Sequence, residues 1–554
     1  MRRITMPAAL VALALLAGCV SIPTGGGVTS IEVEADGIDN PLLSLPSLPA
    51  QDATPAEIVA GFIRAGRGPQ EDYRVAREYL TGELRESWSP AARTLISSTP
   101  IEPEPLADNT WSVTINAGSS VDAQGRYQTV SPAASFDLAF GLVKDDAGQW
   151  RISSAPDGTV LPPDRFASIF TSYELYFFDP SGDFLVPDLR WYRSGEAAVP
   201  SVIDGLLAGP SDRLGAGILA SAFPPGTERT GTPTLVDGTA TVQLSSEAAA
   251  VTPATRRRMQ QQVLQSLRSV GSVRQLDITV NGVVVQMPEG GSTPDSSFLV
   301  GNDPVGALDG RIGVLTADGV KAMPDIGDTA DAVEARGGSI VSHARDRLVL
   351  GGSAGVTLVS AGAAPQVVDA RSDLAVPSLD PFGYIWSVPR SAPSQLQAIG
   401  PDGTAHQVPG MPGTGRVMSI DVARDGARLL VALETGEGPR LVVLGIQRDE
   451  GLVPTGLLTP LDLPIDSAAL LDAAWVDGIT VVALSDGPLT AVDAYDIGGQ
   501  HTSLGTLDGG VAIVGGNTLD GTRVLDELGN IMRPGGGTSW QDTGIDATYL
   551  ITQL

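Results

Sequence analysis

The sequence contains one cysteine, Cys19, in 554 residues. A single cysteine cannot form an internal disulfide bond, and it cannot supply the cysteine ligands of a zinc or iron–sulfur site. Lysine is almost as scarce, with Lys144 and Lys321 as its two copies. The formal net charge of -29 argues against a nucleic-acid-binding role and against electrostatic adhesion to anionic lipids.

The apolar run at the N-terminus is too short to span a membrane. Arg2 and Arg3 precede an apolar segment over residues 7–17, about half of the roughly 20 residues that a spanning helix needs. It therefore predicts a cleaved signal peptide over residues 1–18. The sequence Leu16-Ala17-Gly18-Cys19 closes the segment and resembles a bacterial lipobox. An ordinary signal peptide that happens to contain a cysteine is the alternative.

The thiol of Cys19 is a nucleophile that can accept a thioether-linked diacylglyceryl group. We expect S-diacylglyceryl and N-acyl groups on Cys19 after cleavage following Gly18. Two or three acyl chains hold a protein firmly at a bilayer, whereas one chain holds it only marginally. The sequence thus predicts a protein anchored by lipid to the extracytoplasmic face of the cell membrane.

Residues 19–53 are rich in Gly, Pro and Ser and predict a flexible tether. Residues 54–165 predict an α+β domain, because Thr54 and Pro55 suit a helix N-terminus and strand patterns follow the helices. These strand patterns suggest a curved antiparallel sheet, and the order of elements resembles a cystatin-like domain.

Residues 171–289 predict a second α+β domain. Asp237-Gly238 separates two short strand patterns, as in a tight hairpin. Thr252 and Pro253 suit another helix N-terminus. The polar face of this helix carries Arg256-Arg257-Arg258, which either contacts an acidic partner or is simply a solvated helix face.

Residues 297–554 lose the helical periodicity and predict an all-β domain. Short apolar runs alternate with turns, and a strand–turn–strand unit begins near residues 376, 417 and 471. This spacing is typical of four-stranded propeller blades, five or six of which would fit the length. A pair of β-sandwiches is the alternative. Residues 290–292, which are Gly and Ser, are expected to form the boundary before this domain.

These features together resemble the LpqB family of Gram-positive envelope lipoproteins. Residues 185–187, 207–210, 236–238 and 278–282 resemble motifs of a GerMN domain in the family's order, and residues 378–386 resemble its β-propeller. The resemblance implies a role at the extracellular side of the sensor kinase MtrB, in the MtrA/MtrB two-component system. It therefore implies a non-catalytic modulator of an MtrB-like kinase and of envelope homeostasis, with the kinase's extracellular domain as partner.

The sequence offers no convincing catalytic or cofactor site. Residues 351–355 match the Gly-x-Ser-x-Gly pattern of a nucleophile elbow, but a strand pattern follows Ser353 where an elbow needs a helix. His343, His406 and His501 are scattered singly, without metal-ligand spacing. We therefore predict that the protein is not an enzyme and has no metal or other cofactor.

Two further patterns have a structural and a functional interpretation. The Asp-Gly pairs that begin at residues 318, 402, 425, 477, 486, 508 and 520 could hold calcium, although tight turns also favour these residues. Trp386 and Trp475 could stack on sugars or fill the cores of blades. The second function considered is accordingly a cell-wall glycan-binding module, in which exposed tryptophans and carboxylates would hold the glycan.

The lipid anchor is testable at Cys19. Replacing Cys19 by Ser removes the thiol that accepts the diacylglyceryl group, so Cys19→Ser should abolish lipidation and leave the signal peptide uncleaved by the lipoprotein peptidase. Metabolic labelling with palmitate measures this directly. Equal label in the wild type and in the variant would show that Cys19 is not the attachment site.

Overall fold

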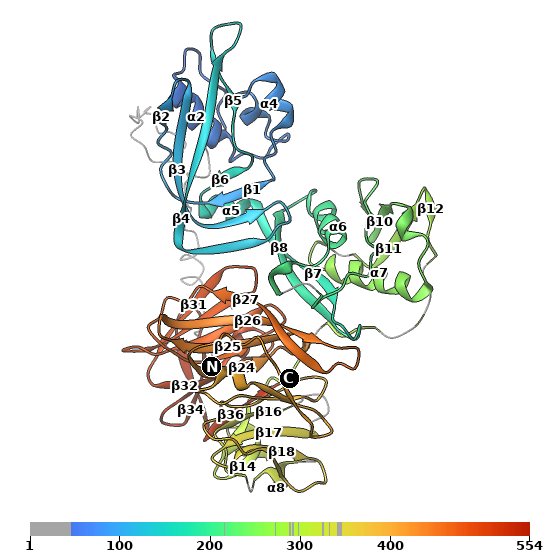
Figure 1. The fold of residues 1–554 in the computed structure, drawn as a ribbon, viewed down its shortest axis with the longest axis vertical. Helices are drawn as coiled ribbons and strands as arrows, with labels where there is room; N and C mark the ends of the chain where they lie inside the picture. The colour runs from blue at the N-terminus through green and yellow to red at the C-terminus, as the bar shows by residue number, and fades with distance from the viewer. Residues whose placement is uncertain are drawn as a thin grey trace, which may run out of the picture. The chain divides into compact units, whose positions relative to one another are not determined.

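The computed structural model describes residues 46–554, apart from positions 215–216, 272, 287–289, 291–292, 297, 324–325, 332 and 341–345. Figure 1 shows the arrangement of its helices and strands. Cys19, the predicted signal peptide and residues 19–45 of the predicted tether lie outside the described residues. His343 and residues 291–292 of the predicted boundary also lie outside them.

The N-terminal region begins with helix α2 (Pro55–Ala65), followed by α3 (Arg74–Arg77) and α4 (Gly82–Ser87). The predicted start of α2 is confirmed by a capping box. Thr54 Oγ1 accepts a hydrogen bond from the Glu57 backbone N–H at 3.4 Å, and Glu57 Oε2 accepts one from the Thr54 N–H at 2.7 Å. Just before the helix, the backbone carbonyl of Ser47 accepts a hydrogen bond from the Tyr79 hydroxyl at 2.8 Å.

The sheet beside α2 has the order β5-β4-β3-β1-β6, with β2 paired to β3. The strands are β1 (Arg93–Ile96), β2 (Glu104–Ala107), β3 (Thr110–Asp122), β4 (Tyr127–Lys144), β5 (Trp150–Ser154) and β6 (Thr159–Leu161). The prediction of a wholly antiparallel sheet is wrong in one place, because β1 and β6 are parallel. Parallel neighbours require a long connection, and the intervening strands supply it.

The middle region starts with α5 (Pro163–Ile169) and a long hairpin of β7 (Phe170–Phe178) and β8 (Leu185–Arg193). Two helices follow, α6 (Ala198–Ala208) and, later, α7 (Pro253–Ser266). Short 3-10 turns occupy Asp212–Leu214 and Ser246–Ala248. A four-stranded sheet of order β12-β11-β10-β9 completes the region. Its strands are β9 (Thr234–Val236), β10 (Thr239–Leu244), β11 (Gln275–Val280) and β12 (Val283–Val284).

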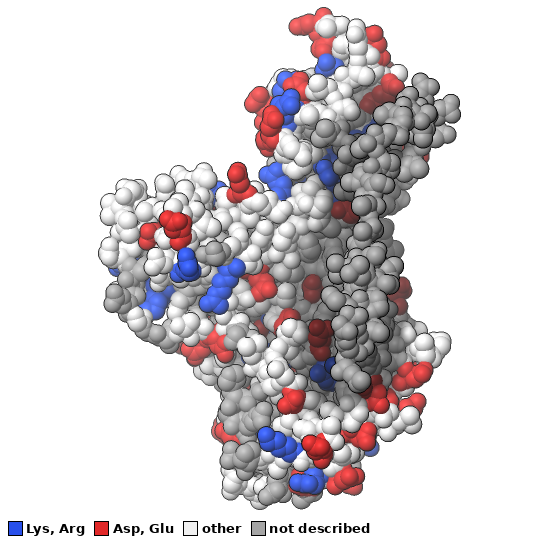
Figure 2. All heavy atoms as spheres, turned by 180° about the vertical axis from the view of Figure 1, so that it is seen from behind, with Lys and Arg blue, Asp and Glu red and all other residues white. Residues whose placement is uncertain are grey.

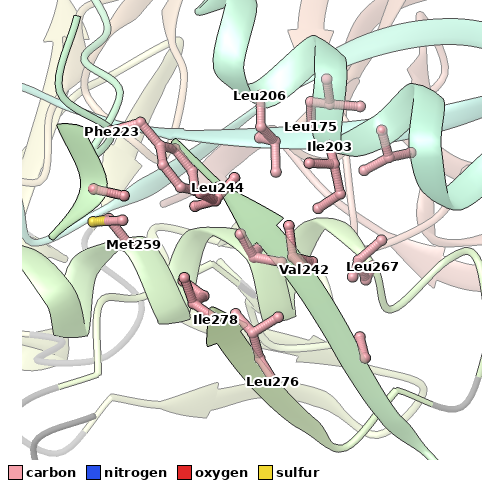
Figure 3. Packing of buried hydrophobic residues seen from close by; sticks show 14 of the residues in the cluster. Leu175, Ile203, Leu206, Phe223, Val242, Leu244, Met259, Leu267, Leu276 and Ile278 are labelled. Atoms are coloured by element: carbon pink, nitrogen blue, oxygen red, sulfur yellow. The ribbon is translucent and has the colours of Figure 1, made fainter. Parts of the chain in front are cut away.

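The predicted hairpin at Asp237-Gly238 is confirmed, with φ of 51° and 81° at these two residues. Helix α7 connects β10 to its parallel neighbour β11. Figure 3 shows the resulting core, in which Val242 and Leu276 of the sheet face Met259 of α7 and Ile203 of α6. One face of the sheet is thus closed by the two helices.

In the described residues of the C-terminal region, four four-stranded sheets and one eight-stranded sheet, which spans two blades, make up six four-stranded blades. Their strands in chain order are β13 (Val305–Leu308), β14 (Arg311–Thr316), β15 (Gly319–Ala322), β16 (Gly337–Ile340), β17 (Arg347–Gly352), β18 (Gly355–Ser360), β19 (Gln366–Asp369), β20 (Ser378–Leu379), β21 (Ile385–Ser387), β22 (Gln397–Ile399), β23 (Ala405–Gln407), β24 (Arg416–Val422), β25 (Arg428–Thr435), β26 (Gly438–Arg448), β27 (Pro454–Leu463), β28 (Leu470–Trp475), β29 (Thr480–Ser485), β30 (Thr490–Asp496), β31 (His501–Leu507), β32 (Gly510–Val514), β33 (Arg523–Asp526), β34 (Asn530–Pro534), β35 (Trp540–Asp546) and β36 (Tyr549–Gln553). Short helical turns lie at Gly327–Ala330, Pro393–Gln395 and Leu519–Gly521.

The last strand, β36, closes the ring of blades. It is antiparallel to β13 and parallel to β16, the inner strand of the next blade. The first blade is therefore built from both ends of the region, with β36 inside and β13 to β15 outside it. Gly306 faces the backbone of Tyr549 so closely that a Cβ atom would collide with the Tyr549 carbonyl. The structure is a propeller, and the alternative of two β-sandwiches is wrong.

Removing β36 should open the propeller. A fragment of residues 297–554 should fold alone with an all-β far-ultraviolet circular dichroism spectrum, whereas residues 297–547 should lose the inner strand of the first blade. Because Tyr549, Leu550 and Ile551 are buried, the loss should cost on the order of 5 kcal/mol in unfolding free energy.

Urea unfolding of the two fragments measures the difference, and adding a synthetic peptide of residues 545–554 to the shorter one serves as a rescue control. Substantial helix in the longer fragment, or equal stability of both, would contradict the closure described above.

Candidate functional site

The centre of the propeller contains a continuous set of polar side chains, which we call the inner-strand ring. Its members lie on the inner strands of four consecutive blades, and each accepts a hydrogen bond from a backbone N–H of the next blade. The side chains are Ser339 on β16, Ser378 on β20, Ser419 and Asp421 on β24, and Asp472 on β28.

The distances in the inner-strand ring are those of ordinary hydrogen bonds. Ser378 Oγ accepts from Val422 N at 3.0 Å, Asp421 Oδ2 from Trp475 N at 2.9 Å, and Asp472 Oδ2 from Ile513 N at 3.0 Å. Inner strands of neighbouring blades splay apart and cannot form a complete ladder. The side-chain acceptors satisfy backbone donors that would otherwise be buried without a partner.

The two carboxyl groups of the ring are electrostatically unusual. Burial raises the pKa of Asp421 to about 7 and the pKa of Asp472 to about 6. Their hydrogen bonds from backbone N–H groups act in the opposite direction but do not outweigh the loss of hydration. Perturbed carboxyl groups can mark catalytic sites. Here, however, all four carboxylate oxygens accept hydrogen bonds within the protein.

Two pairs of opposite charge are buried in the blades. Asp380 and Arg448 have fully buried side chains, 2.7 Å apart, and the Arg448 guanidinium lies 4.5 Å from the centre of the Phe382 ring. Asp425 and Arg428 form a second buried ion pair. Removing one partner of such a pair leaves an uncompensated buried charge, which lowers the free energy of unfolding by several kcal/mol. These groups therefore act as structural anchors between strands.

Three comparisons with known proteins agree with this architecture. Residues 48–167 match the family described as "Lipoprotein LpqB, N-terminal domain", and residues 310–545 match "Lipoprotein LpqB beta-propeller domain". Residues 174–286, between them, match the family described as "Sporulation and spore germination". The chain belongs to the LpqB lipoprotein family.

Curated LpqB relatives match over long stretches. Lipoprotein LpqB of Cutibacterium acnes is 27% identical over 98% of this chain and 97% of its own length. Lipoprotein LpqB of Streptomyces coelicolor is also 27% identical, over 82% of each chain. That of Corynebacterium diphtheriae is 31% identical over 39% of this chain and 38% of its own.

Solved structures resemble parts of the chain. The first GerMN domain of the sporulation protein GerM from Bacillus subtilis is 22% identical, covers 23% of this chain and 94% of that domain, and has a TM-score of 0.19. A streptogramin B lyase is 12% identical, covers 43% of this chain and 81% of its own, and has a TM-score of 0.30.

The nucleophile-elbow interpretation of residues 351–355 fails in this LpqB family member, as predicted. Strands β17 and β18 form a hairpin in which Gly352 pairs with Gly355, so Ser353 lies in the turn. His406 lies on β23 and His501 on β31, in different blades. Among the residues that the structure describes, no group of three or more His, Cys, Asp or Glu could hold a metal ion.

The two predicted core tryptophans are confirmed as buried. Trp386 is 0% exposed and donates from Nε1 to Asp380 Oδ2 at 3.0 Å, while Trp475 is 2% exposed and donates to the Asp421 carbonyl at 3.1 Å. Neither can stack on a sugar. Several Asp-Gly pairs are turns, as at Asp402, whose Oδ1 accepts from the Thr404 N–H at 2.9 Å.

The N-terminal region contains a small apolar cavity that sequence reasoning missed. Its volume is about 100 Å³, and Phe62, Trp88, Leu138 and Phe140 contribute to its wall. Apolar cavities of similar size can accept a small apolar molecule. Within the described chain, no helix is long and apolar enough to cross a bilayer.

The buried carboxyl groups make a prediction about pH. Their pKa values in the folded protein lie above the value of about 4 for an aspartate in an unfolded chain. The folded state therefore binds more protons between these values, and its stability falls as the pH rises. The wild type should lose stability from about pH 4 to about pH 7, and the loss should be complete at pH 8. Asp421→Asn keeps an acceptor for Trp475 N without the charge, and should be more stable than the wild type at pH 8 by about 1 to 3 kcal/mol.

Urea unfolding of the soluble mature chain at several pH values tests this. Asp402→Asn is the matched control, because that carboxylate is exposed and hydrogen bonds from Thr404 lower its pKa. An Asp421→Asn protein that is less stable than the wild type at pH 8, with an unchanged pH profile, would refute the effect.

Proposed function

We propose that this LpqB family member is a non-catalytic, lipid-anchored extracytoplasmic protein that presents its propeller to a protein partner. The observation that carries the proposal is the inner-strand ring. Its polar side chains are used to join the blades, so the centre of the propeller is a rigid support and not a set of free acids, bases or nucleophiles. A rigid propeller offers preorganised loops and faces for recognition.

The partner we propose is the extracellular domain of an MtrB-like sensor kinase. The family resemblance supports this choice, and the charge of the propeller indicates the chemistry of the contact. Residues 297–554 carry 31 Asp and Glu against 14 Lys and Arg. Figure 2 shows acidic side chains scattered over the drawn face, with uncharged and basic side chains between them. Such a surface suits a partner with a basic face and speeds encounter at low salt.

Anchoring would make a weak interface effective. A flexible tether of about 35 residues has a root-mean-square reach of roughly 30 to 35 Å. Confinement to this layer raises the effective concentration toward the millimolar range when the tether spans the gap. The glycan-binding alternative loses its main support, because Trp386 and Trp475 are buried.

The kinase proposal predicts a direct complex. The soluble mature chain should bind the purified extracellular domain of an MtrB-like kinase, and affinity should fall as salt is raised from 50 to 500 mM because exposed charges are screened. Isothermal calorimetry measures both. Deleting the gene should change phosphorylation of the response regulator and alter the cell envelope in the same direction as disturbing the kinase.

Purified peptidoglycan serves as the competing ligand in the same assay. Absence of association with the kinase domain, together with unchanged regulator phosphorylation, would eliminate the kinase role. Retention on peptidoglycan would then favour the glycan-binding function.

A further inference from the structure

Positive charge is concentrated in one segment of this acidic protein. Between Ala248 and Leu276 the chain has five arginines and no aspartate or glutamate, although the whole chain has a net charge of -29. Three of them, Arg256, Arg257 and Arg258, lie in the first half of α7. The positive end of the helix dipole is at the same end, so these side chains are placed where a cation is electrostatically unfavourable.

The three arginines lack acidic partners among the described residues. The described residues form thirteen ion pairs, and none of these includes Arg256, Arg257 or Arg258. Arg258 lies against Gly182, next to Asp183, and over the Phe178 ring. Arg256 and Arg257 have no such contact with an aromatic ring or an acidic turn in any described interaction. Both side chains are half-buried, and within the described part of the chain no carboxylate neutralises their charge.

Arg256 contacts the chain just after an exposed apolar hairpin. Arg256 Nη1 donates to the Gln286 carbonyl at 3.1 Å, two residues after β12. Strand β12 consists of Val283 and Val284, which are 69% and 49% exposed. We call Arg256, Arg257, Arg258, Val283 and Val284 the α7 basic patch. All five residues belong to the GerMN region, so the patch does not depend on any other region.

We propose that the α7 basic patch docks the GerMN region onto the anionic headgroup surface of a membrane. Arginine beside exposed aliphatic side chains is the combination that holds a protein at a lipid interface, with the apolar groups at the boundary of headgroups and acyl chains. An acidic protein segment would require the arginines but not the two exposed valines. This inference deepens the proposed lipid anchoring by adding a second, protein-borne contact with the bilayer.

The acidity of the rest of the chain does not prevent this contact. Charges separated by more than about 8 Å are largely screened at physiological ionic strength. A membrane surface therefore senses mainly the charges of the part that touches it. Each arginine near an anionic surface contributes roughly a fivefold gain in affinity.

The test uses the mature chain without its lipid, carrying Cys19→Ser, and vesicles of phosphatidylglycerol mixed with phosphatidylcholine. The chain should sediment with these vesicles and not with pure phosphatidylcholine, and less so at 500 mM salt. The double variant Arg256→Gln/Arg257→Gln should bind at least tenfold more weakly, and Val283→Ser/Val284→Ser severalfold more weakly.

A matched control removes the same charge elsewhere. Arg416→Gln/Arg440→Gln alters two partly exposed propeller arginines and should leave vesicle binding unchanged. Circular dichroism confirms that every variant is folded. Equal binding to both kinds of vesicle, or equal weakening by the two arginine pairs, would overturn the proposal.

Binding to a poly-glutamate peptide but not to vesicles would also overturn it, because the patch would then be a protein-docking surface. Because the chain in these assays carries no lipid, failure here leaves both the lipid anchor and the proposed kinase interaction standing. Success or failure of the kinase-binding assay is likewise independent of the vesicle result.

Discussion

The pairing of β36 with β13 is the interaction on which the propeller depends. It joins residues at the two ends of the region, with Val305 opposite Ile551. Gln553 reinforces the closure, because its Nε2 donates to the Gly301 and Asp303 carbonyls at 3.2 and 3.0 Å. Without this strand, the inner edges of two blades would expose unpaired backbone groups. Contacts so distant in sequence also form late, since the loop entropy must be lost before they contribute.

The inner-strand ring supplies hydrogen-bond acceptors to backbone N–H groups at the centre of the propeller. Six blades around one axis leave backbone N–H groups at the centre that no ladder reaches, and burial makes each unpaired group costly. Serine and aspartate on the inner strands accept these hydrogen bonds. Asp421 and Asp472 do so at the expense of their own hydration, as their raised pKa values indicate. The hydrogen bonds that join the blades therefore also occupy the acidic side chains at the centre.

Charge is distributed unevenly between the regions. The propeller carries most of the acidic excess, whereas α7 and the segments flanking it carry only arginine. The lipid surface and the basic protein partner that we propose would therefore contact different parts of one chain. The GerMN core beneath α7 keeps the helix fixed, because Met259 and Val263 are almost fully buried.

The sequence by itself determined those helix starts and turns that depend on residues only a few positions apart. Thr54 and Glu57 specify a helix start, and Asp237-Gly238 specifies a hairpin because both residues tolerate positive φ. The lipobox predicted at Cys19 likewise rests on adjacent residues, and it stays a prediction. Much of the three-region architecture followed from such signals, as did the turn at Ser353. The α7 arginines were visible in the sequence, but their lack of partners and the neighbouring valines were not.

Only the tertiary structure decided the strand pairings and side-chain contacts between residues far apart in the sequence. Six blades, the parallel pairing of β6 with β1, and the closure by β36 have no local signature. Ser378 and Asp421 look like ordinary strand residues in the sequence. Only the packing of adjacent blades brings each beside a backbone N–H some 40 to 55 residues away. Short-range preferences are encoded by neighbouring side chains and backbone dihedral angles. Long-range pairing is selected by the joint requirement to bury apolar surface and satisfy every buried polar group.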